Sequence, residues 1–229
     1  MQGYERPEEC RTSDHSGVLR SHCYGFGKLN LPERPKDVPT KQASAAVGQC
    51  ELMYTYDKLF AEYSHTVAQL LVTWEDFDHP HRLNNLQNTL ERLIQLGAVP
   101  VINENDPIST EEYSLGDNDR LGALIAKYTH ADLLVLLSDI DGLYTADPHT
   151  HPEATLIHRV ESVTPEIEQL GGGSNSAGTG GMSAKLTAAK IATGAGVDMV
   201  IANGANANVL YDIVDGKDVG TRFLGRKQK

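Results

Sequence analysis

Two apolar runs in the middle of the chain each end in a cluster of polar residues, and this pattern constrains the fold more than any other feature. VPVI at 99–102 is followed by NEND at 103–106, and DLLVLL at 132–137 is followed by Ser138 and Asp139. If both runs are parallel strands, their polar ends lie along one edge of a sheet. Ligands of open α/β sheets bind outside the carboxyl ends of the strands. The sequence therefore predicts a binding site at that edge.

Segments with the pattern of strands and helices alternate along the rest of the chain. Further strands are predicted within 65–74 and 197–204. Helices are predicted at 39–63, 81–97, 117–128, 182–194 and 208–216, with a short one that Thr164 caps and Pro165 begins. We expect Gly97 to end its helix in the left-handed conformation. Strands separated by helices of this length are typical of parallel βαβ units, so we expect an α/β fold. A length of 229 residues favours one domain around a single core.

The composition argues against several classes of protein. A formal net charge of -11 and an isoelectric point near 5.2 argue against a nucleic-acid surface, which needs clustered Lys and Arg. No apolar run is long enough to cross a membrane, and the first residues carry no signal-peptide pattern. The odd number of cysteines, 3, fits a reduced compartment, so we expect a cytoplasmic protein. No metal site is expected, because the N-terminal cysteines and histidines match no zinc spacing: Cys10, His15, His22 and Cys23.

A glycine-rich loop, GTGGMSAK at 178–185, leads directly into a predicted helix. Glycines allow the backbone to approach a phosphate, and the first turn of a helix offers unpaired N–H groups. Lys185 lies in that first turn, where its ammonium group can reach the same anion. The loop lacks the Gly-Lys-Ser/Thr ending of the Walker motif. A plain flexible loop before a helix is the alternative interpretation.

The other polar clusters also have a structural alternative. NEND at 103–106 can bind a zwitterionic substrate, or it can form an Asx turn that satisfies its own backbone. Asp117, Asn118 and Asp119 can contribute to the same edge of the sheet, or they can simply cap a helix. Because both clusters are predicted at one edge, the binding interpretation gains support.

Several motifs together resemble the glutamate 5-kinases of the amino acid kinase superfamily. They are GFGKLNLPERP at 25–35, KQASAAVGQCELM at 41–53, VPVINEND at 99–106, GDNDRLGAL at 116–124, DLLVLLSDIDGLYTADP at 132–148, GTGGMSAK at 178–185 and VGTRF at 219–223. Loops such as GTGGM and LSD occur in sister kinases, whereas NEND together with GDND points to glutamate. The resemblance implies a three-layer α/β/α sandwich with a mainly parallel sheet.

The resemblance also implies an activity. ATP, carried as its Mg²⁺ complex, would phosphorylate the side-chain carboxylate of L-glutamate to glutamyl 5-phosphate, the first step of proline biosynthesis. The implied partners are L-glutamate, ATP and further copies of the chain in a homo-oligomer. A sister kinase that acts on another carboxylate or on a nucleotide is one alternative. A non-catalytic remnant that binds an amino acid is another.

Roles for single residues follow from the same resemblance. Asp106 and Asn118 would bind glutamate, and Asp119 would orient the reacting groups. Lys185 would act on the phosphoryl group that is transferred. The residues implied to bind ATP are Ser138, Asp139, Thr179, Gly180, Gly181, Met182, Ser183, Ala184 and Lys185.

The N-terminal part departs from the family pattern. Residues 1–24 match none of its motifs and predict a disordered leader before a kinase domain at 25–229. We expect this domain to lack the family's first strand, with its lysine and Gly-Ser turn, and the second strand that ends in Ser-Gly-Ala. Weak folding or weak catalysis follows as a hypothesis. No RNA-binding-like domain is expected after the kinase domain.

Overall fold

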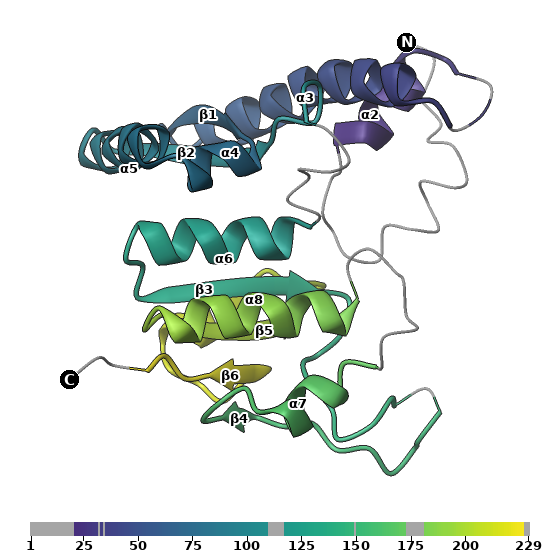
Figure 1. Cartoon of the computed structure of the whole chain (residues 1–229), viewed down its shortest axis with the longest axis vertical. Helices are drawn as coiled ribbons and strands as arrows, with labels where there is room; N and C mark the ends of the chain where they lie inside the picture. The colour runs from purple at the N-terminus through teal and green to yellow at the C-terminus, as the bar shows by residue number, and fades with distance from the viewer. Residues whose placement is uncertain are drawn as a thin grey trace. The chain divides into compact units, whose positions relative to one another are not determined.

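The computed structural model describes residues 21–31, 33, 35–109, 117–148, 150–172 and 181–226, with the backbone alone for 21–24. The chain divides into two compact units, Met1–Leu115 and Gly116–Lys229, where the sequence predicted a single core. Each unit combines helices with a sheet of its own (Figure 1). The prediction of an α/β fold with mainly parallel strands is confirmed.

The first unit places helices around a two-stranded parallel sheet. Its elements are α2 (Ser21–Lys28), α3 (Val38–Ala61), β1 (Thr66–Val72), α4 (Trp74–Asp78), α5 (Pro80–Gln95) and β2 (Ala98–Glu104). In the sheet, Val72 of β1 is the partner of Glu104 of β2, so both strands end at the same edge. Helix α2 was not predicted, and it begins within the segment that was expected to be a disordered leader. It packs closely on α3, because a Cβ atom at Gly25 would lie 1.7 Å from the Ser44 carbonyl oxygen.

Local sequence explains where these helices begin and end. Asp37 caps α3 by accepting hydrogen bonds from the Thr40 N–H at 2.9 Å and hydroxyl at 2.7 Å. These bonds lower the pKa of the Asp37 carboxyl from its usual value. The amphipathic helix α5 buries Leu86 and Leu90. Gly97, with φ +75°, follows α5 in the left-handed conformation, as predicted.

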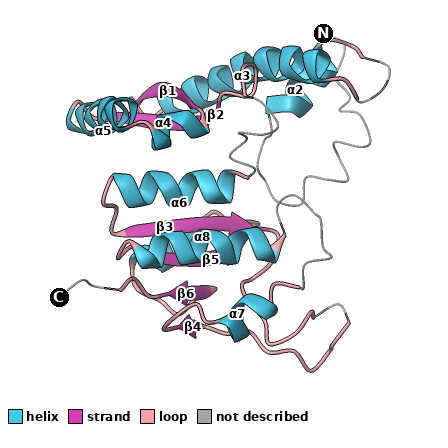
Figure 2. Ribbon diagram, in the orientation of Figure 1, coloured by secondary structure: helices cyan, strands magenta, loops and turns pink. Residues whose placement is uncertain are grey.

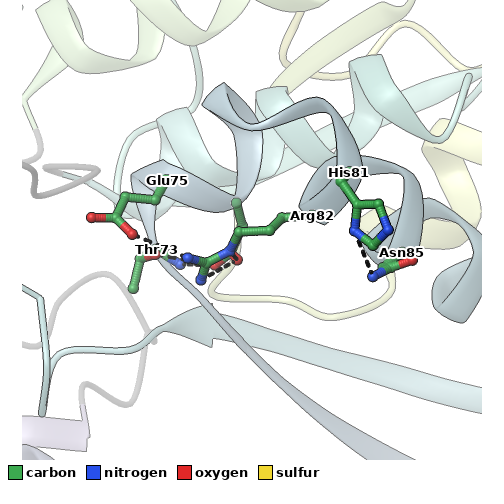
Figure 3. Close-up of polar contacts among 6 residues, drawn as sticks. Thr73, Glu75, His81, Arg82 and Asn85 are labelled. Atoms are coloured by element: carbon green, nitrogen blue, oxygen red, sulfur yellow. Dashed lines mark hydrogen bonds and ion pairs between the residues drawn. The ribbon is translucent and has the colours of Figure 1, made fainter.

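Charged side chains stabilise the turn after β1, and the strand ends earlier than the sequence predicted. The sequence placed Trp74 within the strand region, but β1 ends at Val72 and Trp74 begins α4. The Thr73 N–H donates to Asp76 at 2.6 Å, so a capping box ends the strand and starts the helix. Arg82 of α5 then forms an ion pair with Asp76 at 2.7 Å. It also pairs with Glu75 at 3.1 Å (Figure 3). These contacts hold the corner between α4 and α5.

Replacing Asp76 with alanine is expected to lower the free energy of unfolding by about 1–2 kcal/mol, because the capping box and one ion pair are lost together. Glu75→Ala is the matched control, since its carboxylate is 55% exposed and pairs with the same arginine. It should change stability by less than about 0.5 kcal/mol. Thermal unfolding followed by circular dichroism measures both variants. Equal losses would contradict a special role for the capping box.

The second unit contains a four-stranded mixed sheet with helices packed on it (Figure 2). Its elements are α6 (Asn118–Tyr128), β3 (Leu133–Ser138), β4 (Arg159–Val160), α7 (Pro165–Gln169), α8 (Met182–Gly194), β5 (Asp198–Asn203), α9 (Val209–Val214) and β6 (Thr221–Phe223). The strand order is β3-β5-β6-β4. β3 and β5 are parallel, as predicted, but β6 runs antiparallel to β5. The sequence predicted neither β4 nor β6, because strands this short carry no periodic pattern.

The core of the second unit lies between β5 and the helices that cover the sheet. Met199 and Ile201 of β5 and Phe223 of β6 are fully buried. Ala188, Ala189 and Ala192 give α8 a buried face without bulky side chains, which lets the helix lie close to its neighbours. Thr164 caps α7 and Pro165 begins it, as predicted. No helix in the described residues of either unit is long and apolar enough to span a membrane.

Candidate active site

The carboxyl end of β2 in the first unit holds the predicted NEND cluster. The N–H of Asn105 donates to the Val72 carbonyl at 2.8 Å, which extends the pairing of β1 with β2 by one residue. A turn follows, closed by the main-chain N–H groups of Ile108 and Ser109, which both donate to the Asn105 carbonyl at 3.0 and 2.9 Å. Asp106 lies in this turn and is half-buried. Asp106, the residue predicted to bind glutamate, therefore lies on a well-formed loop at the end of a strand.

Side chains from three segments converge on this loop. Asn103 donates to the Gln49 amide oxygen at 3.1 Å, and Ser109 donates to the Glu104 carboxylate at 2.7 Å. Gln42 donates to the Ser109 carbonyl at 3.2 Å. The helix α3 thus supplies two glutamines to the strand end, and the sequence reasoning assigned neither of them to the site. Their spacing of seven residues places both side chains on one face of the helix, and this spacing could have indicated that they act at the same site.

In the second unit, β3 and β5 end side by side. Ser138 of β3 is the register partner of Asn203 of β5, and the Gly204 N–H donates to the Ser138 carbonyl at 2.8 Å. Ser138 is buried and its hydroxyl donates to the Asp139 carboxylate at 3.1 Å. Asp139 itself is exposed beyond the strand end. The predicted pair is thus one fixed hydroxyl and one accessible carboxylate.

A second polar group at this strand end was missed by the sequence reasoning. Asp141 accepts hydrogen bonds from the Asn203 amide at 2.8 Å and from the Tyr144 hydroxyl at 3.1 Å. Burial raises the pKa of the Tyr144 hydroxyl, and its hydrogen bond to Asp141 raises it further. Asn203 was predicted to end a strand, and this position could have indicated that it belongs to the polar group at the strand end. The contact with Asp141, 62 residues earlier, could only be seen in the folded chain.

The start of α8 has the features expected of a phosphate site. Gly181 is the N-cap, and because it has no side chain, none competes for the N–H groups of the first helical turn. Met182, Ser183 and Ala184 follow in that turn, with the Ser183 side chain exposed. The positive end of a helix and free N–H groups favour an anion at this position. Thr179 and Gly180, which were also predicted to bind ATP, lie outside the described residues.

Lys185 and Asp119 form the central ion pair of the second unit. The Lys185 Nζ atom lies 3.0 Å from Asp119 Oδ2, and the two side chains are only 10% and 17% exposed. Asp119 comes from the first turn of α6 and Lys185 from the first turn of α8, two helices that pack against each other. The carboxylate thereby holds the Lys185 ammonium group at the first turn of α8, whose N-cap Gly181 has no side chain. Both residues predicted to act in catalysis are brought together.

The sequence left open whether Asp117, Asn118 and Asp119 cap a helix or bind a ligand, and the three residues differ in this respect. Asp117 is the N-cap of α6 and accepts from the Asp119 N–H at 3.3 Å, so the capping interpretation is correct for this residue. Asn118 is exposed and Asp119 pairs with Lys185, so neither side chain is used as the cap. Within the described residues, no group of three or more His, Cys, Asp or Glu side chains could hold a metal ion.

Comparison with known proteins identifies the family of the chain. Residues 12–203 match the amino acid kinase family, and the match begins inside the segment that was predicted to be a leader. Glutamate 5-kinase from Clostridium perfringens is 48% identical over 208 residues, which cover 89% of this chain and 77% of the relative. Glutamate 5-kinase from Carboxydothermus hydrogenoformans is 52% identical over 206 residues, 90% of this chain and 55% of the relative.

The solved structures agree on the fold. UMP kinase from Ureaplasma parvum superposes with a TM-score of 0.56 at 12% identity, over 87% of this chain and 75% of that one. Identity this low shows a shared fold and nothing about the substrate. The family match and the level of identity to the curated relatives are much more specific. The chain belongs to the amino acid kinase family and, within it, to the glutamate 5-kinases.

Proposed function

We propose that this chain transfers the γ-phosphoryl group of ATP to the side-chain carboxylate of L-glutamate and forms glutamyl 5-phosphate, the first step of proline biosynthesis. The observation that carries the proposal is the Lys185–Asp119 pair beside the start of α8, in a chain of the glutamate 5-kinase family. A lysine held in the first turn of a helix is suited to a phosphoryl group, which carries negative charge on several oxygens.

The chemistry of the reaction explains why these groups are needed. A carboxylate is a weak nucleophile, so catalysis depends on alignment and on neutralising the charge that repels it from the phosphate. Lys185 contributes a positive charge, and the N–H groups after Gly181 contribute hydrogen bonds. Asp119 keeps the ammonium group at a fixed position. Mg²⁺ bound to ATP would neutralise further phosphate charge.

The remaining predicted residues supply binding groups. Asn118 presents an exposed amide beside Asp119, which suits a carboxylate or an ammonium group of glutamate. Asp106 offers a carboxylate for the ammonium group. Ser138 ends β3 beside the end of β5 and Asp139 follows it, and both would bind ATP there. Each role rests on the family pattern together with the position of the residue at a strand or helix end.

Trapping the acyl phosphate tests the activity directly. Purified chain is incubated with ATP, Mg²⁺, L-glutamate and hydroxylamine, and glutamyl hydroxamate is the expected product. A panel of other acceptors, with other carboxylates and a nucleoside monophosphate, should give no comparable turnover. Folded protein that yields no hydroxamate would contradict the proposed activity. If another acceptor were phosphorylated faster than glutamate, that acceptor would be assigned as the substrate.

Asp106→Ala is expected to raise KM for glutamate by at least about tenfold, because a charged partner of the ammonium group is lost, while kcat changes less. Steady-state kinetics with varied glutamate at saturating ATP measure the effect. Asp78→Ala removes an exposed carboxylate of the same unit and serves as the matched control. A fall in kcat at unchanged KM would show that Asp106 does not bind the ground-state substrate.

A further inference from the structure

The polar cluster at the carboxyl end of β2 includes a buried hydrogen-bond donor without a partner. Gln49 on α3 is 6% exposed, and its amide oxygen accepts from Asn103 at 3.1 Å. Its Nε2 atom is closed off from solvent and has no hydrogen-bond partner in the described structure. Buried polar groups are nearly always paired, so an unpaired one calls for an explanation.

The neighbouring groups of the same cluster already have partners. Glu104 accepts from Ser109, the Ser109 carbonyl accepts from Gln42, and the Asn105 carbonyl closes the turn. Within the described residues, none of these acceptors is hydrogen-bonded to the Gln49 Nε2 atom. Its contact with Asn103 places them at the strand end, where ligands bind in sheets of this kind.

We propose that Gln49 Nε2 donates a hydrogen bond to a carboxylate oxygen of the amino-acid substrate, a role that rests on the proposed function. Glu104 and Asp106 make this loop acidic, so they attract an ammonium group and repel a carboxylate. A zwitterion bound there needs a donor for its carboxylate. An N–H group that bonds an anionic oxygen makes one of the stronger hydrogen bonds. Gln49 thereby selects an amino acid over a simple amine.

Gln49→Glu tests the proposal by changing only the free atom. The carboxylate keeps the oxygen that accepts from Asn103 and replaces the unpaired amino group with an anionic oxygen. The dissociation constant of L-glutamate, measured by calorimetry on the full chain at pH 8, should rise at least about tenfold. Affinity for ATP should stay within about twofold. An unchanged or tighter affinity for glutamate would overturn the proposal.

Gln49→Met is the second variant, because a buried carboxylate can itself destabilise the fold. Methionine fills a similar volume without charge, and it should also weaken glutamate binding by about tenfold. Gln169→Glu, on the exposed end of α7, is the matched control for added charge and should bind glutamate as the unchanged chain does. If Gln49→Met melts as the unchanged chain does and binds glutamate equally well, Gln49 has only a packing role.

A smaller ligand identifies which carboxylate is bound. 4-Aminobutyrate is glutamate without its α-carboxylate. If Gln49→Met leaves its affinity unchanged, Gln49 binds the α-carboxylate; an equal loss for both ligands assigns the side-chain carboxylate instead. Binding is measured without turnover, so a chain that binds glutamate but forms no hydroxamate contradicts the proposed activity and still tests Gln49. A chain that does not bind glutamate contradicts both.

Discussion

Replacing Lys185 with methionine is expected to lower kcat for glutamate phosphorylation by about 10²–10³-fold, the usual effect of removing one group that stabilises charge in the transition state. The Nζ atom is held 3.0 Å from Asp119 at the start of α8, so its position is set before substrate binds. KM for glutamate should change much less, because the lysine acts on the phosphoryl group. Steady-state kinetics with each substrate varied in turn measure both constants.

Two further variants separate catalysis from stability. Breaking a largely buried ion pair leaves one charge uncompensated and costs about 3–5 kcal/mol, so Lys185→Met alone is expected to unfold at a lower temperature than the unchanged chain. The double variant Lys185→Met with Asp119→Asn removes both charges and should regain most of the thermal stability without regaining activity. Lys190→Met, on the same helix with its side chain 64% exposed, is the matched control and should keep full activity. A double variant with near-normal kcat would rule out the role of Lys185.

Gly220→Ala is expected to lower the free energy of unfolding by about 3 kcal/mol. Gly220 has φ +67°, a conformation that costs an L-residue about 1 kcal/mol. Its added Cβ atom would also lie 2.1 Å from the Ile201 carbonyl oxygen, on the central strand β5. Either β5 or β6 must then shift, although the two strands are paired at Ile201 and Thr221.

Gly216→Ala separates the two causes of that loss. Gly216 has φ +77°, and a Cβ atom there would meet nothing within 4 Å. The substitution should therefore cost only the backbone term, about 1 kcal/mol. Thermal unfolding of both variants gives the comparison. Equal losses would show that backbone conformation, rather than close approach to β5, sets the requirement for glycine.

Short-range chemistry explains which features were predictable. The leucines of α5 recur at helical spacing, Asp117 and Thr164 precede helices as caps, and the apolar residues of β3 form one run. Each of these signals lies within a few residues of the structure that it produces. β4 and β6 have only 2 and 3 residues, and they exist because neighbouring strands pair with them. Their prediction would have required knowledge of the sheet.

The sequence by itself determined the strand-end clusters, the glycine-rich start of α8 and the family to which they belong, because each is a contiguous motif with local chemistry. Only the tertiary structure decided which of these groups meet. Asp119 and Lys185 are 66 residues apart, and Gln49 and Asn103 are 54 apart. Contacts at such separation depend on how helices pack on sheets, and the local sequence around each residue does not predict that packing. For the same reason, the Gln49 Nε2 atom, which has no partner among the described residues, could be identified only in the folded chain.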